Sequence, residues 1–456
     1  LLNAHFAEDY PAATVAGWRK AAGVAPDELI PVLKPEEFGD APKDRFRAEA
    51  AFYFSLEKKF FADMGALLKD ELGLKSLVIG TADHSDSYCG YAHIEANLEL
   101  DFIDGHGYWQ HPHTGDKPRI ENTPMVNNPW DSTIIQFART PVAGVPYTIS
   151  ETNHPFPHEY SCEGIPLLTA YAMLNDWDGL YWFCYNAGPA REQVTISARR
   201  FFDMSVEPGK VTQIAACAPM WHRGDVAEAK RTLLRSYEHA EILDKLGMER
   251  WKYRPYFTEG FAKTTALVHS TRFALDGRPT SEFPPEKDPN AIVSDTGELG
   301  WYDAEKERGV VVVDTPGTQA LIGYVADSGR DTSNMAAAVE NDFCAIQLSA
   351  LDGESIADAK RLLLSATAVT ASGELTWNAD RKGIDAWEDG PALIAPVKEI
   401  VRLSGLPAGS GALRVTPMTV TGRALAPAVE VTLRDGVAEI PIGAHACTWY
   451  LLELEN

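Results

Sequence analysis

The sequence predicts an α/β region followed by an all-β region. In the first half, helical and strand patterns alternate, and each predicted strand is apolar until its C-terminal end, where polar and aromatic residues gather. In the second half, short apolar runs are separated by Gly, Pro, Asp and Asn, which is typical of an antiparallel sandwich. We therefore expect a parallel sheet with its site at the carboxyl edge, and a β-sandwich behind it.

The first half opens with two helical patterns, over residues 3–20 and 44–72, and Gly73 follows the second as a stop signal. Between and after the next four strands we expect helices at 93–100, 134–139 and 165–175. The four strands are predicted at residues 75–81, 101–109, 146–150 and 178–186. A closed eight-stranded barrel takes about 250 residues, and four strands alone leave open edges. The remaining strands are therefore expected upstream of Leu1 or on another chain.

The second half begins with a predicted helix over residues 226–246, in which charges alternate with leucines. Strands then follow at residues 309–314, 318–325, 343–351, 360–369, 394–403, 412–415, 428–433, 437–442 and 448–452. This pattern predicts a β-sandwich region over residues 223–456, built as one or two small β domains. The α/β region covers residues 1–222.

Composition limits the classes of partner. The 456 residues, 45% of them hydrophobic, are enough for a large core. A formal net charge of −24 argues against nucleic acid and anionic membrane surfaces, because a field of that sign repels phosphates. The 11 Trp residues suit contact with sugar rings, although core packing explains most of them.

Other signals are weak. The six cysteines are scattered without a CxxC motif, which predicts buried free thiols and neither a zinc knuckle nor a disulfide framework. No apolar stretch is long enough to span a bilayer, and no glycine loop for phosphate or other cofactor motif is present. We expect a soluble protein without a cofactor, whether cytoplasmic, periplasmic or secreted.

The most informative segment is Tyr147-Thr-Ile-Ser-Glu151-Thr-Asn153-His154. An apolar, β-branched strand delivers one carboxylate to its carboxyl end, and polar groups follow at once. Because substrates sit at the carboxyl ends of strands in parallel α/β barrels, Glu151 is predicted to be catalytic.

This ordered set of motifs resembles a known family. Ile79-Gly-Thr81, Phe102-Ile-Asp104-Gly-His106-Gly-Tyr108-Trp109, the Glu151 segment and Trp177-Asp-Gly-Leu-Tyr-Trp182 are similar, in this order, to the second half of the catalytic barrel of clan A glycoside hydrolases. The resemblance covers about residues 1–222. It implies the C-terminal half of a (β/α)8 TIM barrel, with an accessory β-sandwich behind it.

The resemblance also implies roles. Glu151 matches the nucleophile, and Tyr108 and His106 match groups that hydrogen-bond the nucleophile or the sugar. Trp182 matches the floor beneath the sugar at the cleavage point. The clan's general acid/base, a Glu that follows Asn, has no counterpart here and is expected upstream of Leu1.

The implied reaction explains these residue types. Retaining glycosidases need two carboxyl groups about 5–5.5 Å apart, one to attack the anomeric carbon and one to protonate the leaving oxygen. Hydrogen bonds from Tyr108 or Asn153 would keep the nucleophile ionised. Trp109 is a further candidate for stacking on a sugar, and His106, Asn153 and His154 are candidates for binding its hydroxyls. The expected substrate is a β-linked oligo- or polysaccharide.

Two alternatives stay open. A metal-dependent barrel hydrolase would use the imidazoles and carboxylate that cluster in sequence at His106, His111, His113, His154, His158 and Glu159. Against it, prolines keep His154 and His158 from sharing a helix face, and no HExxH motif is present, so no metal site is predicted. The second alternative is a non-catalytic carbohydrate-binding protein, which the missing acid/base leaves open.

Overall fold

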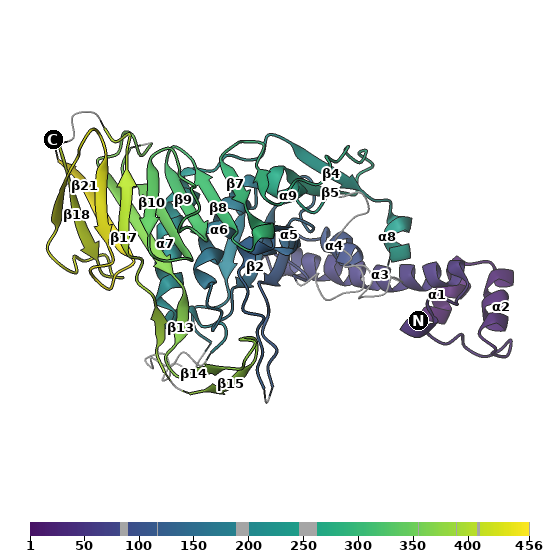
Figure 1. Cartoon of the computed structure of the whole chain (residues 1–456). Helices are drawn as coiled ribbons and strands as arrows, with labels where there is room; N and C mark the ends of the chain where they lie inside the picture. Colours follow the sequence, from purple (N-terminus) through teal and green to yellow (C-terminus); the bar gives the residue numbers. More distant parts are fainter. Residues whose placement is uncertain are drawn as a thin grey trace.

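A computed structural model of the chain describes residues 1–82, 90–115, 117–187, 200–245, 262–353, 355–388, 390–407 and 411–455. The molecule is elongated, with α1 and α2 at one end and the C-terminal strands at the other (Figure 1). The parallel strands lie between these ends. Within the described residues, no helix is long and apolar enough to cross a bilayer.

The N-terminal helices form a small core of their own. They are α1 (Leu2–Asp9), α2 (Ala12–Ala21) and α3 (Lys43–Ala66), and α3 continues as a π-helical turn over Leu67–Glu71. Phe6, Trp18 and Phe52 are buried together, and the rings of Phe6 and Trp18 meet edge to face with centroids 5.1 Å apart. The predicted helix over residues 44–72 is confirmed, whereas the one over residues 3–20 is divided into α1 and α2 at Tyr10 and Pro11.

The α/β region contains a three-stranded parallel sheet in the order β1-β2-β3. Its strands are β1 (Ile103–Tyr108), β2 (Tyr147–Asn153) and β3 (Gly179–Trp182). The helices α4 (Gly90–Asn97), α5 (Thr133–Phe137), α6 (Gly164–Leu174) and α7 (Pro208–Arg223) alternate with these strands or follow them. In the described part of the chain, β1 and β3 each pair on one side only.

The prediction of a strand at residues 75–81 is wrong. Side chains occupy two of its backbone donors: the Val78 N–H donates to Asp101 Oδ2 at 2.7 Å, and the Thr81 N–H donates to Asn97 Oδ1 at 2.9 Å. Backbone groups bonded in this way are not available for a ladder. Three strands are too few to form half of a TIM barrel, so that part of the fold stays a prediction.

The prediction of a helix over residues 226–246 holds only at its end. β4 (Thr232–Ser236) pairs in parallel with β5 (Ser270–Ala274), and only α8 (His239–Lys245) is helical. Within β4, Leu233 is buried, whereas Leu234 and Arg235 are partly exposed. The segment therefore does not bury the apolar face that an amphipathic helix would bury. Pairing with β5, 38 residues away at Ser236 and Ala274, overrides the local pattern. A short helix, α9 (Thr265–Val268), precedes β5.

A nine-stranded antiparallel sheet dominates the second half, in the order β19-β18-β21-β12-β11-β9-β8-β7-β6. Its strands are β6 (Ala291–Val293), β7 (Leu299–Tyr302), β8 (Val310–Asp314), β9 (Thr318–Gly323), β11 (Cys344–Ala350), β12 (Arg361–Ala368), β18 (Ala412–Met418), β19 (Val429–Thr432) and β21 (Trp449–Glu455). A second antiparallel sheet contains β10 (Met335–Val339), β17 (Glu399–Leu403) and β20 (Ala438–Ile442).

The nine-stranded sheet buries residues on both faces. On one face, Ile346 and Leu364 share a core with Val401 and Ile440 of the second sheet. On the other, Ile322 and its neighbours share a core with α6 and α7. The coarse prediction of an α/β region followed by an antiparallel β region is therefore confirmed. The division at residues 222 and 223 stays a prediction.

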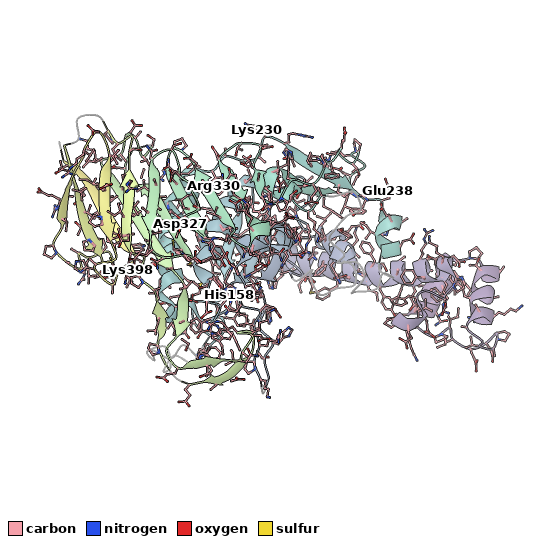
Figure 2. All side chains as sticks on the ribbon, in the orientation of Figure 1. His158, Lys230, Glu238, Asp327, Arg330 and Lys398 are labelled. Carbon is pink, nitrogen blue, oxygen red and sulfur yellow. The ribbon has the colours of Figure 1, made fainter. Side chains whose placement is uncertain are left out.

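An arm extends from the β region toward the α/β region. It consists of β13 (Thr370–Ser372), β14 (Leu375–Trp377), β15 (Ile384–Trp387) and β16 (Ala392–Ile394), and it lies below the large sheet in Figure 1. The Ile120 N–H donates to Lys382 O at 2.8 Å, and the Ile384 N–H donates to Pro118 O at 2.9 Å. His158, labelled in Figure 2, lies where the arm meets the α/β region, and its carbonyl accepts from Thr370 Oγ1 at 3.3 Å.

The two regions also meet at Gly309, just before β8. A Cβ atom there would lie 2.0 Å from Val126 O, the carbonyl that accepts from Trp301 Nε1 at 2.7 Å. We expect Gly309→Ala to lower the free energy of unfolding by about 1–3 kcal/mol, because backbone must move apart. Gly17→Ala is the control: Gly17 lies inside α2 with nothing within 4 Å of the new Cβ, and this substitution should be neutral or stabilising. Urea unfolding of both variants measures this, and equal effects would contradict the close approach.

Candidate active site

The geometry of the site begins with an irregularity in β2. Gly105 of β1 pairs with Ile149 and His106 pairs with Glu151, so β2 carries one residue more than β1 over this stretch. The pairing with β3 shows the same extra residue in β2, because Leu180 pairs with Ile149 and Trp182 pairs with Thr152. The extra residue falls at Ser150 and Glu151. Such a bulge lets consecutive side chains turn to the same side of a sheet, and bulges are common next to active sites.

The bulge places Glu151 on what we call the site face, the face of the sheet that carries Asp104 and His106. The opposite face, the helix face, carries Tyr147 and Ile149, which are buried in the core that contains α5 and α6. In a regular strand, Glu151 would follow Ile149 onto the helix face. On the site face its side chain is instead 27% exposed.

Two neighbours on β1 contact the Glu151 carboxylate. The Tyr108 hydroxyl donates to Glu151 Oε1, and His106 Nδ1 lies 3.4 Å from Glu151 Oε2. The structure therefore brings together three of the predicted site residues, each partly exposed. The roles that the resemblance implies for His106 and Tyr108, to hydrogen-bond the nucleophile or the sugar, stay predictions.

Behind His106 lies a buried carboxyl group, Asp104, with no exposed side-chain surface. It accepts from the hydroxyls of Thr148 and Ser150, and Ser150 Oγ lies 2.9 Å from His106 Nε2. Burial raises the pKa of Asp104, and the two hydroxyls and His106 partly offset that rise. Asp104 and Ser150 were missed by sequence reasoning. Asp104 was detectable, because it lies two residues before His106 on the same strand, and residues two apart on a strand share a face.

Aromatic rings continue the site face beyond Tyr108. The Tyr108 ring lies 5.2 Å from Phe202 and 5.0 Å from His111, and Phe202 lies 5.7 Å from Phe183. Phe183 is 36% exposed. These rings offer apolar faces of the kind that carbohydrate-binding sites use. Phe202 was not predicted, because no strand or motif in the sequence marks it.

Three other predicted residues are buried below the site. Trp109 is 5% exposed and donates from Nε1 to Thr123 O at 2.7 Å. Asn153 is fully buried, and His154 is 2% exposed. Burial lowers the pKa of His154 well below its usual range, and nearby His158 and Lys210 lower it further. In this arrangement the three side chains support the site from within and offer no surface to a ligand.

Trp182 is not brought to Glu151. Trp182 pairs with Thr152, the residue after Glu151. Because successive side chains on a strand point to opposite faces and Glu151 is on the site face, Thr152 and Trp182 lie on the helix face. There it lines a pocket of about 340 Å³ with Leu180, Ile214 and Trp221, between β3 and the helices α6 and α7. Its predicted place as the floor under a sugar therefore has no support in this geometry.

A buried lysine anchors the end of β2. Lys210, on α7, is 2% exposed, and its Nζ lies 2.7 Å from Glu207 Oε2 and donates to Asn153 Oδ1 at 2.9 Å. Asn153 Nδ2 donates in turn to Phe202 O at 3.1 Å. Burial lowers the pKa of Lys210, and Glu207 counteracts that shift. This network ties Glu151's strand to the segment that carries Phe202.

A second buried carboxyl group, Glu163, lies beside His154. Glu163 Oε1 accepts from the Met125 N–H at 2.6 Å, Oε2 accepts from the Val126 N–H at 3.0 Å, and Oε1 lies 3.6 Å from His154 Nε2. Burial raises the pKa of Glu163 to about 8, although the two amides oppose the rise. Burial also lowers the pKa of His158 to about 3. Both imidazoles are therefore neutral near pH 7.

The histidines of the metal alternative do not form a metal site in the part of the chain that the structure describes. There, no group of three or more His, Cys, Asp or Glu residues is placed to hold a metal ion. His158 Nε2 lies 2.9 Å from Thr123 O, which binds it to the backbone. The five described cysteines are all free thiols.

Comparison with known proteins adds little to this geometry. No protein-family model matches the chain, and no curated protein matches it in sequence. The crystal structure of the GH39 enzyme from Xanthomonas axonopodis pv. citri aligns with a TM-score of 0.29 and 11% sequence identity over 88% of this chain. The chain spans 64% of the length of that enzyme. A TM-score this low does not establish a shared fold.

The Lys210 network makes a prediction about stability. Lys210→Met should lower the free energy of unfolding by about 3–5 kcal/mol, because it leaves the Glu207 carboxylate buried without its counter-charge. Adding Glu207→Gln should recover part of the loss. Lys306→Met, which removes an exposed lysine paired with Asp303, should cost about 0–1 kcal/mol. Urea unfolding measures all three, and a cost for Lys210→Met as small as that of the control would show that the pair contributes little.

Glu163 makes a prediction about pH. Its pKa of about 8 in the folded state lies above the ordinary value of 4.5, so the folded state binds the extra proton and stability falls as pH rises from about 4.5 to 8. Between pH 6.5 and 8.5 this group should cost about 2 kcal/mol. Glu163→Gln should remove that loss, whereas Glu8→Gln, on the exposed side of α1, should keep it. Denaturant unfolding at the two pH values tests this, and equal slopes for all three proteins would contradict it.

Proposed function

We propose that the protein is a retaining glycoside hydrolase that acts on a β-linked oligo- or polysaccharide, with Glu151 as its nucleophile. The observation that carries this proposal is the bulge in β2, which turns Glu151 onto the site face and leaves it partly exposed between Tyr108 and His106. A nucleophilic carboxylate must be ionised, accessible and held in one orientation. Glu151 meets the last two of these conditions through its exposure and its two neighbours.

The groups around Glu151 have separate tasks in this proposal. The Tyr108 hydroxyl orients Glu151 Oε1, and Oε2, which lies 3.4 Å from His106 Nδ1, is the oxygen that attacks the anomeric carbon. The faces of Phe202 and Phe183 contact the C–H face of the sugar. His111, 5.0 Å from the Tyr108 ring, supplies a polar partner for a sugar hydroxyl in this proposal.

The second carboxyl group comes from polypeptide that completes the parallel sheet. Two apolar surfaces beside β1 and β3 support this part of the proposal. At one, Leu77 is 70% exposed beside a pocket of about 440 Å³ lined by Phe61, Leu67 and Ile79. At the other, Tyr181 of β3 is 60% exposed. Parallel sheets are normally covered on both faces and paired at both edges, so a further segment or a second chain has a place to bind.

The test uses sugars that need no acid catalyst to react. In a 2-deoxy-2-fluoro-β-glycoside of 2,4-dinitrophenol, the dinitrophenolate departs without protonation. The fluorine slows hydrolysis of the glycosyl-enzyme in the second step. The full chain, incubated with such glycosides of glucose, galactose, mannose and xylose, should gain one glycosyl group on the peptide that contains Glu151. Peptide mass spectrometry locates the adduct.

The matched controls are Glu151→Gln, which should gain no adduct, and Glu159→Gln, which should be labelled like the unmodified protein. With ordinary aryl β-glycosides, NMR of the first product should show retention at the anomeric carbon. Inversion, or an adduct at another carboxylate, would refute the proposal. Sugar binding without any adduct would favour a carbohydrate-binding protein, and loss of turnover with a chelator would favour a metal-dependent hydrolase.

A further inference from the structure

Three polar groups, His106, Ser150 and Asp104, form a hydrogen-bonded series behind the Glu151 carboxylate. The Ser150 hydroxyl donates to Asp104 Oδ2, and Ser150 Oγ lies 2.9 Å from His106 Nε2. The other ring nitrogen, His106 Nδ1, lies 3.4 Å from Glu151 Oε2. His106 therefore faces a carboxyl group through each ring nitrogen, directly on one side and through a hydroxyl on the other.

The number of hydrogens available to these groups limits how they can be protonated. If Asp104 and Glu151 are ionised, Ser150 uses its one hydrogen to donate to Asp104, and His106 Nε2 must carry a hydrogen to donate to Ser150. A neutral imidazole has no second N–H, so the lone pair of Nδ1 would then face the negative oxygen of Glu151. Moving the hydrogen to Nδ1 only shifts the conflict, because Ser150 must then donate to Nε2 and its oxygen faces the Asp104 carboxylate.

One additional proton removes both conflicts, either on Asp104, which would then donate to Ser150, or on His106. Burial raises the pKa of Asp104. An imidazole is nevertheless ordinarily the more basic group, with a pKa of about 6.5 against about 3.9 for an Asp carboxyl. We therefore assign the proton to His106. With a hydrogen on each nitrogen, His106 donates to Ser150 through Nε2 and carries a second N–H on Nδ1, the nitrogen that lies 3.4 Å from Glu151 Oε2. The charge is favourable as well, because a cation then lies between two anions, 3.7 Å from Asp104 Oδ2 and 3.4 Å from Glu151 Oε2. A fully buried carboxylate such as Asp104 needs a nearby cation, and His106 is the basic side chain in contact with it.

The other polar groups around His106 provide neither a second hydrogen nor a positive charge for the two carboxylates. From β1, the Tyr108 hydroxyl already donates to the other oxygen of Glu151. From β2, Thr148 donates to Asp104 and contributes no charge. After β3, Cys184 lies near enough to Glu151 to feel its charge. Burial is the main cause that raises the pKa of the Cys184 thiol to about 11, so this thiol is neutral at pH 8.

We propose that Asp104 and Ser150 are positioning residues that keep His106 doubly protonated near neutral pH, so that a cationic imidazole lies beside the nucleophile Glu151. The proposal rests on the proposed function and extends it to two residues that do not touch the substrate. The proton stays on His106 throughout. When the bond between Glu151 and the sugar breaks in the second step, the carboxylate leaves toward a charged donor already in place.

Nitrogen NMR of the imidazole tests the protonation without any need for activity. In the full chain labelled with ¹⁵N-histidine, and with the signal assigned by its loss in His106→Asn, both ring nitrogens of His106 should show the imidazolium pattern at about pH 8, well above the usual midpoint of about 6.5. Asp104→Asn keeps the shape but removes the anion, and should give a neutral ring at that pH. Thr148→Val, which removes the other hydroxyl on Asp104 but leaves Ser150 in place, should keep the imidazolium.

The kinetic readout is the burst of dinitrophenolate from an activated glycoside and the slower steady state that follows. At pH 8, Asp104→Asn and Ser150→Ala should slow the steady state about tenfold, the loss expected for one charge-assisted hydrogen bond. At pH 6 the loss should shrink, because solvent then protonates His106; a merely structural defect would not depend on pH. Ser150→Ala serves if Asp104→Asn does not fold.

A neutral His106 in the unmodified protein at pH 8, or the same pattern in Asp104→Asn as in the unmodified protein, would overturn the proposal. An imidazolium in a protein that shows no burst would leave the proton arrangement intact and refute the hydrolase function. The two failures are thus separable by experiment.

Discussion

The site depends on one extra residue in β2. Without the bulge at Ser150, the alternation of the strand would carry Glu151 onto the helix face, into a core that has no room for an ionised group. With it, both Ser150 and Glu151 turn toward His106 on the neighbouring strand. One inserted residue therefore places both the Glu151 carboxylate and the Ser150 hydroxyl on the site face.

The surroundings hold this irregular strand in place. Two residues beyond Glu151, Asn153 is fixed by the buried Lys210 and by the carbonyl of Phe202. Buried charges of this kind add little stability compared with an apolar core, but they are costly to break, and they specify one arrangement. A network with each partner in place is thus a suitable support for a strand end whose backbone departs from regular pairing.

The β region contributes to the same support. Gln213 of α7 donates to Thr367 Oγ1 of β12 at 2.7 Å, and Gln347 of β11 donates to Ala216 O at 2.8 Å. The arm adds an edge-to-face aromatic contact, since the ring of Trp387 lies 5.2 Å from Phe201, next to the Phe202 that borders the site. Through α7 and the arm, the large sheet braces the segment that carries the aromatic side of the site.

The sequence by itself determined most helices, most strands and the position of the carboxylate near a strand end. Periodicity is a local property, so α3, α6, β8 and β11 follow from it, and a Glu after a β-branched run is visible in any single chain. Only the tertiary structure decided which side chains meet. The bulge, the burial of Trp109 and the face on which Trp182 lies all depend on the register between strands more than 25 residues apart. A shift of one residue in that register moves a side chain to the other face, and no local pattern records it.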